Sequence, residues 1–328
     1  MCIRDRDLDN LKELHNYSVQ LKNTLDQLSA DIGSGRISWG ELTKKGSVAF
    51  AQEVSNISKS SFSNMEQNFH EYSGLIYDGA FSEHITSKGK KGLTGDNIDE
   101  QKAQEIAKKF IGEDKVQEIT STGKSENTTM PTFDFSVKVN GETNSNMVIS
   151  ISEKGGHVVF MNYNRDIQAE SVTQERADEI GKDFLKSRGF DDMKETYYLK
   201  QDGIVTINYA YEQDGVTVYP DLIKLKVALD NGEIMGIETT GYLNSHEKRN
   251  ISDVKITKEQ AKKDLNSKIE ILSENLAIIP TEWKTEVLCW EFKGKVDDTD
   301  FLVYINAKTG EEQDILVITN TPNGTLTH

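Results

Sequence analysis

Apolar residues in the first quarter of the chain recur at helical spacing. From Leu11 to Ile32 the positions follow alternating steps of three and four residues, with only Ser18 polar in the series, which is the heptad pattern of a helix with one apolar seam. The break "GSGR" is followed by a second helical pattern from about Trp39 to Tyr72. Two such stretches predict an antiparallel helical hairpin or the end of a longer helical bundle.

Three later segments share one helical design. They are "NIDEQKAQEIAKKFI", "SVTQERADEIGKDFL" and "KITKEQAKKDLNSKI", which align without gaps on Asp99, Thr173 and Thr257. Each of these residues can cap a helix, because its side-chain oxygen accepts hydrogen bonds from the free N–H groups of the first turn. An apolar residue precedes each cap and an alanine follows it by four positions, as in a hydrophobic staple. The apolar stripe continues to the end of each segment, so we expect three helices of that length.

An alternating apolar pattern with a glycine turn follows each of these helices. The segments are "MVISISEKGGHVVFM", "LIKLKVALDNGEIMGIE" and "FLVYINAKTGEEQDILVI", and each consists of a strand, a turn and a second strand. Gly156, Gly232 and Gly310 lie in the turns, where glycine supplies the positive φ that such turns need. The three caps lie 74 and then 84 positions apart, which is too long for a solenoid repeat and suits small α+β modules.

The chain is therefore predicted to be an α+β protein, in which a helical N-terminal domain precedes three modules, each with one helix packed on an antiparallel sheet. A module this small has a thin core, so the three are expected to pack on one another. The expected boundaries are 1–6 for a non-native prefix, 7–86 for a truncated helical domain, 87–97 for a Gly/Lys-rich linker, 98–166, 171–245 and 255–320 for the three modules, and 321–328 for a tail.

An irregular aromatic segment, "GLIYDGAFSEHI", lies just before the linker. Its apolar side chains stay soluble only if they are covered, and two interpretations follow. Most apolar loop segments close a local core, here that of the preceding helices. Alternatively, the segment docks the modules or a partner, with Leu75, Tyr77, Phe81 and His84 as the candidate interface residues.

Charge narrows the choice of partner. The net charge is −16, from 54 acidic and 38 basic residues, and only 12 of the acids and 11 of the bases lie in residues 1–95. The acidic remainder repels phosphate backbones and anionic lipid headgroups, which disfavours nucleic acid and direct electrostatic binding to membranes. A protein or glycan partner is favoured instead. The sequence contains no run of eighteen apolar residues, so no part of it is predicted to span a membrane.

Local signatures of catalysis are missing. The sequence has no His-Glu-x-x-His, Cys-x-x-Cys or Gly-x-Ser-x-Gly motif, and "GKS" lacks a P-loop's upstream glycine because Glu118 stands there. The six histidines are scattered, and "DDTD" (297–300) is interpreted as a solvated turn and not a calcium site. Cys289, in an alternating run, is expected to be a buried, inert thiol. We predict no catalytic, cofactor-binding or metal-binding residue, although carboxylate pairs that meet only in space stay open.

Five segments carry a resemblance to a known family: "RISWGEL", "EVSNISKSSFSNMEQNF", "GLIYDGAFSEHI", "YPDLIKLKVALDNGEIMGIE" and "ILVITNTPNGTLTH". The unit of a helix followed by a hairpin resembles the PepSY domain. The whole arrangement, from about residue 7 to the C-terminus, resembles the germination protein YpeB family of endospore-forming Firmicutes.

The resemblance implies a non-enzymatic, extracytoplasmic protein of the spore inner membrane and cortex region, normally tethered by an N-terminal membrane segment. It implies that the protein is needed with the cortex-lytic enzyme SleB to degrade cortex peptidoglycan during germination, by stabilising, localising or regulating that enzyme. Cortex peptidoglycan is a further expected contact, and no cofactor is implied. The family's anchor and the first part of its helical domain are expected to be missing here. Because PepSY modules also occur in protease propeptides, a protease-inhibitory module is the alternative, and a peptidoglycan hydrolase is the third.

Overall fold

A computed structural model describes Phe81 and residues 90–327, apart from residues 126–129, 143–144, 264, 282–284 and 322–323. All the described residues belong to one compact unit, Asp78–His328. The predicted helical hairpin lies outside the described residues and stays a prediction.

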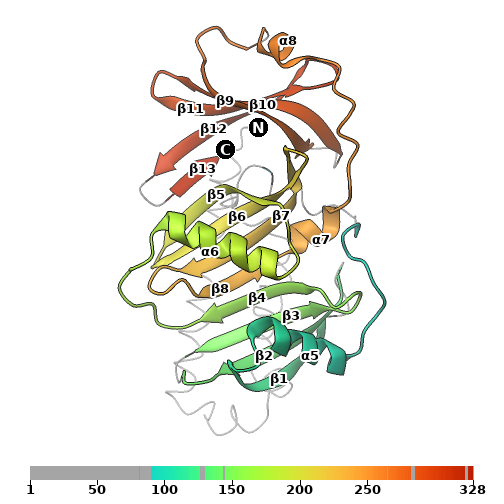
Figure 1. Cartoon of the computed structure of the whole chain (residues 1–328), viewed down its shortest axis with the longest axis vertical. Coiled ribbons are helices and arrows are strands. Elements are labelled where there is room, and N and C mark those ends of the chain that lie inside the picture. The colour runs from blue at the N-terminus through green and yellow to red at the C-terminus, as the bar shows by residue number, and fades with distance from the viewer. Residues whose placement is uncertain are drawn as a thin grey trace, which may run out of the picture. The chain divides into compact units, whose positions relative to one another are not determined.

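The described part is mostly β sheet, with few helices. All thirteen of its strands belong to one hydrogen-bonded sheet, in the order β1-β2-β3-β4-β8-β7-β6-β5-β13-β12-β11-β10-β9. Along the chain these strands fall into three groups, and a helix precedes each group (Figure 1). The described part therefore contains more strand and less helix than the predicted α+β class suggested.

The first group begins with a helix that Asp99 caps. The Asp99 carboxylate accepts a hydrogen bond from the backbone N–H of Lys102 at 2.8 Å, and Ala103 and Ala107 are the buried residues of the helix. The helix packs on the first three strands of its group. The elements of the first group are α5 (Glu100–Ile111), β1 (Val116–Ser125), β2 (Thr132–Val139), β3 (Asn146–Ser152) and β4 (Val158–Asn164).

The second group repeats this order, with Thr173 capping its helix through the N–H of Arg176. Gly181 faces the sheet in this helix, and a β-carbon added there would lie 2.3 Å from the hydroxyl of Tyr209, so only glycine allows this close approach. The second group contains α6 (Gln174–Ser187), β5 (Met193–Gln201), β6 (Ile204–Gln213), β7 (Val216–Ala228), β8 (Ile234–Glu238) and the short α7 (Thr240–Ser245).

The third helix is much shorter than expected. Thr257 and Gln260 form a capping box at its start, but the helix ends at Lys262 instead of continuing to Ile269. Asn266 explains part of the difference, because its side chain accepts from the N–H of Lys268 and so favours a turn. The third group contains α8 (Lys258–Lys262), β9 (Glu270–Pro280), β10 (Glu286–Val296), β11 (Thr299–Asn306), β12 (Glu312–Thr321) and β13 (Gly324–Thr327).

The three predicted glycine turns join antiparallel strands. Gly156, Gly232 and Gly310 have φ values of 66°, 80° and 82°, in the left-handed region that favours glycine. They separate β3 from β4, β7 from β8, and β11 from β12, and each of these pairs is antiparallel. These turns therefore formed as the local sequence predicted.

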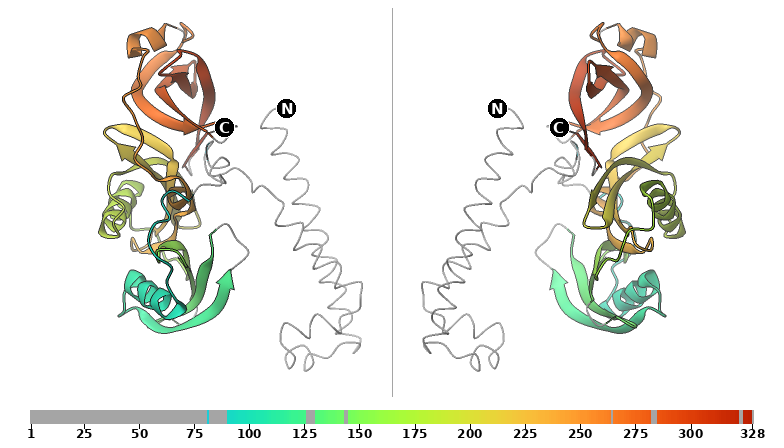
Figure 2. Two further views of the ribbon diagram at one scale, coloured as in Figure 1. Left: turned by 90° about the vertical axis from the view of Figure 1, so that its right-hand side faces the viewer. Right: turned by 90° about the vertical axis from the view of Figure 1, so that its left-hand side faces the viewer.

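Strand pairing also connects the groups. In the antiparallel pair of β4 and β8, Phe160–Asn162 lie beside Gly236–Glu238, and one core cluster extends through the first and second groups. Val216–Val218 of β7 pair in parallel with Leu276–Ile278 of β9. Because β13 also pairs with β5 at one position, eight strands of the second and third groups close into a ring. Figure 2 shows the strands of the third group curled round.

Candidate functional site

The described residues do not form a metal centre, since no three side chains of His, Cys, Asp and Glu among them come close enough to hold a metal ion. No helix within the described ranges has the length and apolar character needed to cross a bilayer. Buried polar side chains come together at the two junctions between the groups of strands. These junctions are the candidate sites.

Inside the ring of strands, aromatic rings surround one carboxylate. We call this set the tyrosine–glutamate cluster, and its members are Phe81, Tyr197 on β5, Tyr219 on β7, Glu291 on β10 and Tyr304 on β11. The ring of Phe81 lies 5.0 Å from that of Tyr219 and 5.4 Å from that of Tyr304. The cluster thus joins the second group, the third group and the segment that precedes the first.

Hydroxyl groups hold the carboxylate of Glu291. Its Oε2 accepts hydrogen bonds from the hydroxyls of Tyr219 at 2.6 Å and Tyr304 at 2.9 Å. The hydroxyl of Tyr197 is buried beside them and makes no hydrogen bond. Burial raises the pKa of all three tyrosines well above the ordinary value, and the charge of Glu291 raises it further. The hydroxyls therefore stay protonated and act as donors.

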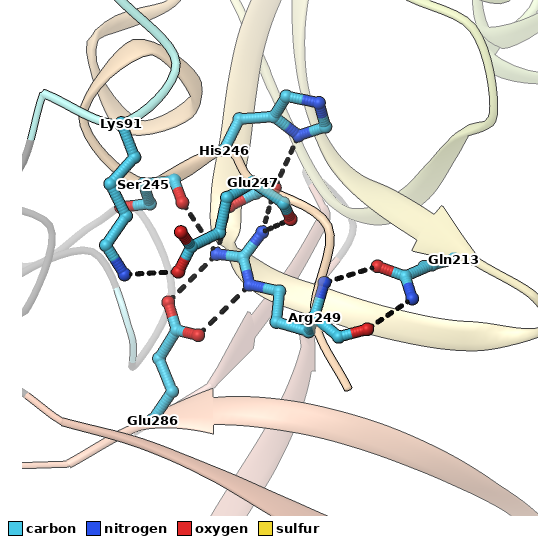
Figure 3. A network of polar contacts seen from close by, with 8 residues as sticks. Lys91, Gln213, Ser245, His246, Glu247, Arg249 and Glu286 are labelled. Carbon is cyan, nitrogen blue, oxygen red and sulfur yellow. Dashed lines mark hydrogen bonds and ion pairs between the residues drawn. The ribbon is translucent and has the colours of Figure 1, made fainter. Parts of the chain in front are cut away.

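A second set of polar residues lies close by, centred on Arg249 (Figure 3). The guanidinium of Arg249 donates two hydrogen bonds to the carboxylate of Asp221 on β7, at 2.5 and 2.6 Å. It donates two more to the carboxylate of Glu286 on β10, at 2.9 and 3.0 Å. The side chain of Asp221 is 0% exposed and that of Arg249 is 7% exposed. Burial alone would lower the pKa of Arg249, but its bonds to Glu286 and Asp221 raise it above the ordinary value. Arg249 therefore stays charged and ties the second group to the third.

The segment around Arg249 is held at several further points. His246 Nδ1 lies 2.7 Å from Asp221 Oδ2, and Arg249 Nη2 donates to the carbonyl of Ser245 at the end of α7. Gln213 pairs with both backbone groups of Arg249, at 2.8 and 2.9 Å. We call this set, together with Asp221, Glu286, Glu247 and Lys91, the Arg249 network.

A similar arrangement joins the first and second groups. Arg165, which follows β4, binds both oxygens of Asp230 at 2.7 and 2.9 Å, and its Nε donates to Glu233 at 2.9 Å. Lys115 of the first group reaches the same glutamate at 2.9 Å. The hydrogen bonds from Arg165 hold the pKa of Asp230 at about 2. Both junctions thus use a buried arginine that binds two carboxylates.

A groove of about 500 Å³ lies beside α5 and α6. The guanidinium of Arg188 stands 5.2 Å from the ring of Phe110 and 4.9 Å from that of Phe184, and Lys115 and Glu233 also line the groove. The groove therefore offers ring faces together with both signs of charge.

Of the four candidate interface residues, the structure describes Phe81 alone. Its side chain is 5% exposed and contacts Tyr219 and Tyr304, which belong to the second and third groups. Leu75, Tyr77 and His84 lie outside the described residues. The assignment of the four as an interface stays a prediction.

Sequence reasoning did not identify the Arg249 network, and of the tyrosine–glutamate cluster it named Phe81 alone. Arg249 lies in "SHEKRN", which has the composition of a solvated loop, so nothing local marks it. Asp221 and Glu291 do carry a signal, because each is a single acid within an apolar strand pattern. On β10, Glu291 stands two residues after Cys289, so both side chains lie on the same face of the strand, toward the inside of the ring. An acid at such a position predicts a buried partner but does not identify it.

Two family models match the chain. Residues 58–252 match the model described as "YpeB sporulation, PepSY1 and PepSY2 domains". Residues 255–316 match the model described as "Peptidase propeptide and YPEB domain". Together they extend over almost all of the described residues.

Known proteins match over nearly the whole chain. The sporulation protein YpeB of Bacillus subtilis (strain 168) is 30% identical over 318 residues, which are 95% of this chain and 69% of that protein. The protein of the same name from Halalkalibacterium halodurans is 27% identical over 317 residues, which are 95% of this chain and 70% of that protein. The solved Bacillus megaterium YpeB C-terminal domain matches with a TM-score of 0.63 and 28% identity, over 69% of this chain and 100% of that one.

Proposed function

Because the chain belongs to the YpeB family of sporulation proteins, we propose that it acts in germination as a non-enzymatic partner of the cortex-lytic enzyme SleB. It would stabilise, localise or regulate that enzyme, so that the enzyme degrades cortex peptidoglycan when the spore germinates. The observation that carries the proposal is the family match over residues 58–252, supported by relatives that align with 95% of the chain.

We further interpret the three groups of strands as three PepSY modules, each built from a helix on an antiparallel sheet. Equivalent alanines support this interpretation. Ala103, Ala177 and Ala261 each stand four residues after a helix cap, and each is 0% exposed. The small side chain at this position lets the first turn of each helix lie close to the neighbouring apolar groups.

The arrangement of charged groups supports a role without catalysis. Asp221 and Asp230 are the acids at the two junctions, and their side chains are 0% and 5% exposed. Each is paired with an arginine that joins two groups of strands, and Arg165 lowers the pKa of Asp230. A general acid needs a raised pKa and access to substrate, so these residues fit a structural role better.

We place the protein on the extracytoplasmic side, in the region of the spore inner membrane and cortex, where its partner enzyme acts. The family resemblance supports this location and implies attachment through an N-terminal membrane segment. Cortex peptidoglycan is a second proposed contact.

A spore-forming host that lacks its own YpeB protein provides the main test. Production of this chain, joined to the host's membrane segment, should restore the level of SleB in dormant spores, measured by immunoblot, and the loss of cortex after germination starts. Unchanged SleB levels in spores that contain the folded protein would remove the proposed partnership. Release of muropeptides by the purified protein alone, abolished by one Asp or Glu substitution, would show that it is an enzyme instead.

A protease-inhibitory module is the second candidate, and the match of residues 255–316 to a model for peptidase propeptides favours it. Incubation of the purified protein with a panel of spore proteases separates the two candidates. Inhibition of one protease at near-stoichiometric protein, with SleB levels unaffected in the host, would support this second function.

A further inference from the structure

Glu291 differs from the other buried acids because it has no cation beside it. Three acidic residues are buried in the described part of the chain: Asp178, Asp221 and Glu291. Asp178 pairs with Lys182 at 2.6 Å, and Asp221 pairs with Arg249. Within the described ranges, no lysine, arginine or histidine pairs with Glu291. A carboxylate buried without a cation is costly, which indicates that this position serves a purpose other than stability.

Some hydrogen-bond acceptors in the tyrosine–glutamate cluster accept no hydrogen bond. Both tyrosine hydroxyls donate to Oε2, so neither engages Oε1. The hydroxyl of Tyr197 is buried in the same cluster and has no hydrogen-bond partner, although it has lone pairs to offer. Glu291 Oε1 and the Tyr197 hydroxyl are therefore the two oxygen acceptors of the cluster that these bonds do not use.

The walls of the cluster favour a cation. The ring of Tyr219 lies 6.5 Å from that of Tyr197 and 6.3 Å from that of Tyr304. Ring faces attract ammonium groups, and they also suit the apolar stem of a lysine side chain. The local charge is negative: burial raises the pKa of Cys289 to about 12, and the charges of Asp314 and Glu291 contribute to that rise.

We propose that the tyrosine–glutamate cluster is a binding site for an alkylammonium group such as that of a lysine side chain. The ammonium pairs with the carboxylate of Glu291, donates to the free oxygens of Glu291 and Tyr197, and lies against the tyrosine rings. An ammonium has three N–H donors and no acceptor, which matches a site that offers oxygens and ring faces. A free amine and a lysine of a protein share this chemistry.

Phe81 covers the site in this structure, where its ring lies against Tyr219 and Tyr304. An incoming ammonium and its stem would take the place of this ring. Replacement of Phe81 with alanine removes the competing ring, so this variant should bind amines more tightly than the wild type.

The test uses the full chain and two amine probes, n-butylammonium and Nα-acetyl-lysine methylamide, with Nα-acetyl-norleucine methylamide as the uncharged match. Binding is measured by calorimetry and by the shift in thermal midpoint. We expect saturable binding of the amines and none of the norleucine compound, with binding to Phe81→Ala about tenfold tighter than to wild type. Tighter binding of the lysine compound than of butylammonium would identify a peptide-borne amine, and the reverse a free one.

Two substitutions locate the ammonium. Glu291→Gln keeps the shape of the side chain and removes its charge, so it should weaken binding by about tenfold or more, whereas Glu312→Gln on the exposed surface should change nothing. Tyr197→Phe removes the unbonded hydroxyl, so it should fold normally and weaken binding even if Glu291→Gln does not fold. The proposal is overturned if amines fail to bind Phe81→Ala, or if they bind Tyr197→Phe and any folded Glu291→Gln protein as tightly as wild type.

Discussion

Removal of Arg249 is the sharpest test of how the second and third groups are held together. The Arg249→Ala substitution deletes the guanidinium that binds both oxygens of Asp221 and both oxygens of Glu286. It also deletes the donors to the carbonyls of Ser245 and Glu247. Because the side chain of Asp221 is 0% exposed, water cannot replace the lost partner without a change in the structure.

The size of the effect follows from burial. Removal of one partner of a buried ion pair typically lowers the free energy of unfolding by about 3–5 kcal/mol, because the other charge stays buried and uncompensated. His246 still contacts Asp221 in the variant, which favours the lower end of that range. For a unit of this size the thermal midpoint should fall by on the order of 10 °C.

Urea unfolding monitored by circular dichroism measures the loss. Arg176→Ala is the matched control, since Arg176 also binds a glutamate but both side chains are more than half exposed. Exposed pairs of this kind contribute about 0–0.5 kcal/mol, so this control should unfold almost as the wild type does.

A loss below about 1 kcal/mol for Arg249→Ala would refute the argument that the pair is buried and cooperative. A double variant adds a second check. In an Arg249→Met background, the further change Asp221→Asn should lower the free energy of unfolding much less than it does in the wild type, because the Asp221 carboxylate has already lost its partner guanidinium. Additive losses would show that the two residues act independently.

Three further predictions concern other parts of the sheet. Arg165 depresses the pKa of Asp230 to about 2, so the ion pair contributes fully to the free energy of unfolding above about pH 4, and this contribution is lost as the pH falls toward 2. Between pH 4 and pH 2 the free energy of unfolding, measured with urea, should fall by about 1–2 kcal/mol more for the wild type than for Asp230→Asn, and equal decreases would contradict this. Gly181→Ala should lower stability by about 1–3 kcal/mol, although alanine favours helix, because its methyl group would overlap a buried tyrosine hydroxyl; a more stable variant in thermal unfolding would show that the helix can shift. Cys289, in a Cys2→Ser background, should react with a thiol reagent only after unfolding, because burial raises its pKa to about 12; rapid labelling of the native protein would show that it is accessible.

The local features of the fold could be predicted because their partners lie close in sequence. Asp99, Thr173 and Thr257 each accept a bond from an N–H three residues later, so the cap needs no distant group. The glycine turns are local in the same sense, since positive φ is a property of one residue. The third helix failed as a prediction, because apolar periodicity continued where a local turn at Asn266 competed with it.

By itself, then, the sequence determined where helices begin, where strands turn, and that acids outnumber bases beyond residue 95. Only the tertiary structure decided that β4 lies beside β8, that β7 meets β9, and that Arg249 joins Asp221, 28 positions before it, to Glu286, 37 positions after it. The physical reason is one of range. A cap or a turn is selected among a few local conformations, whereas each long-range pair is selected by which strand edges and buried charges remain unsatisfied after the local elements have formed.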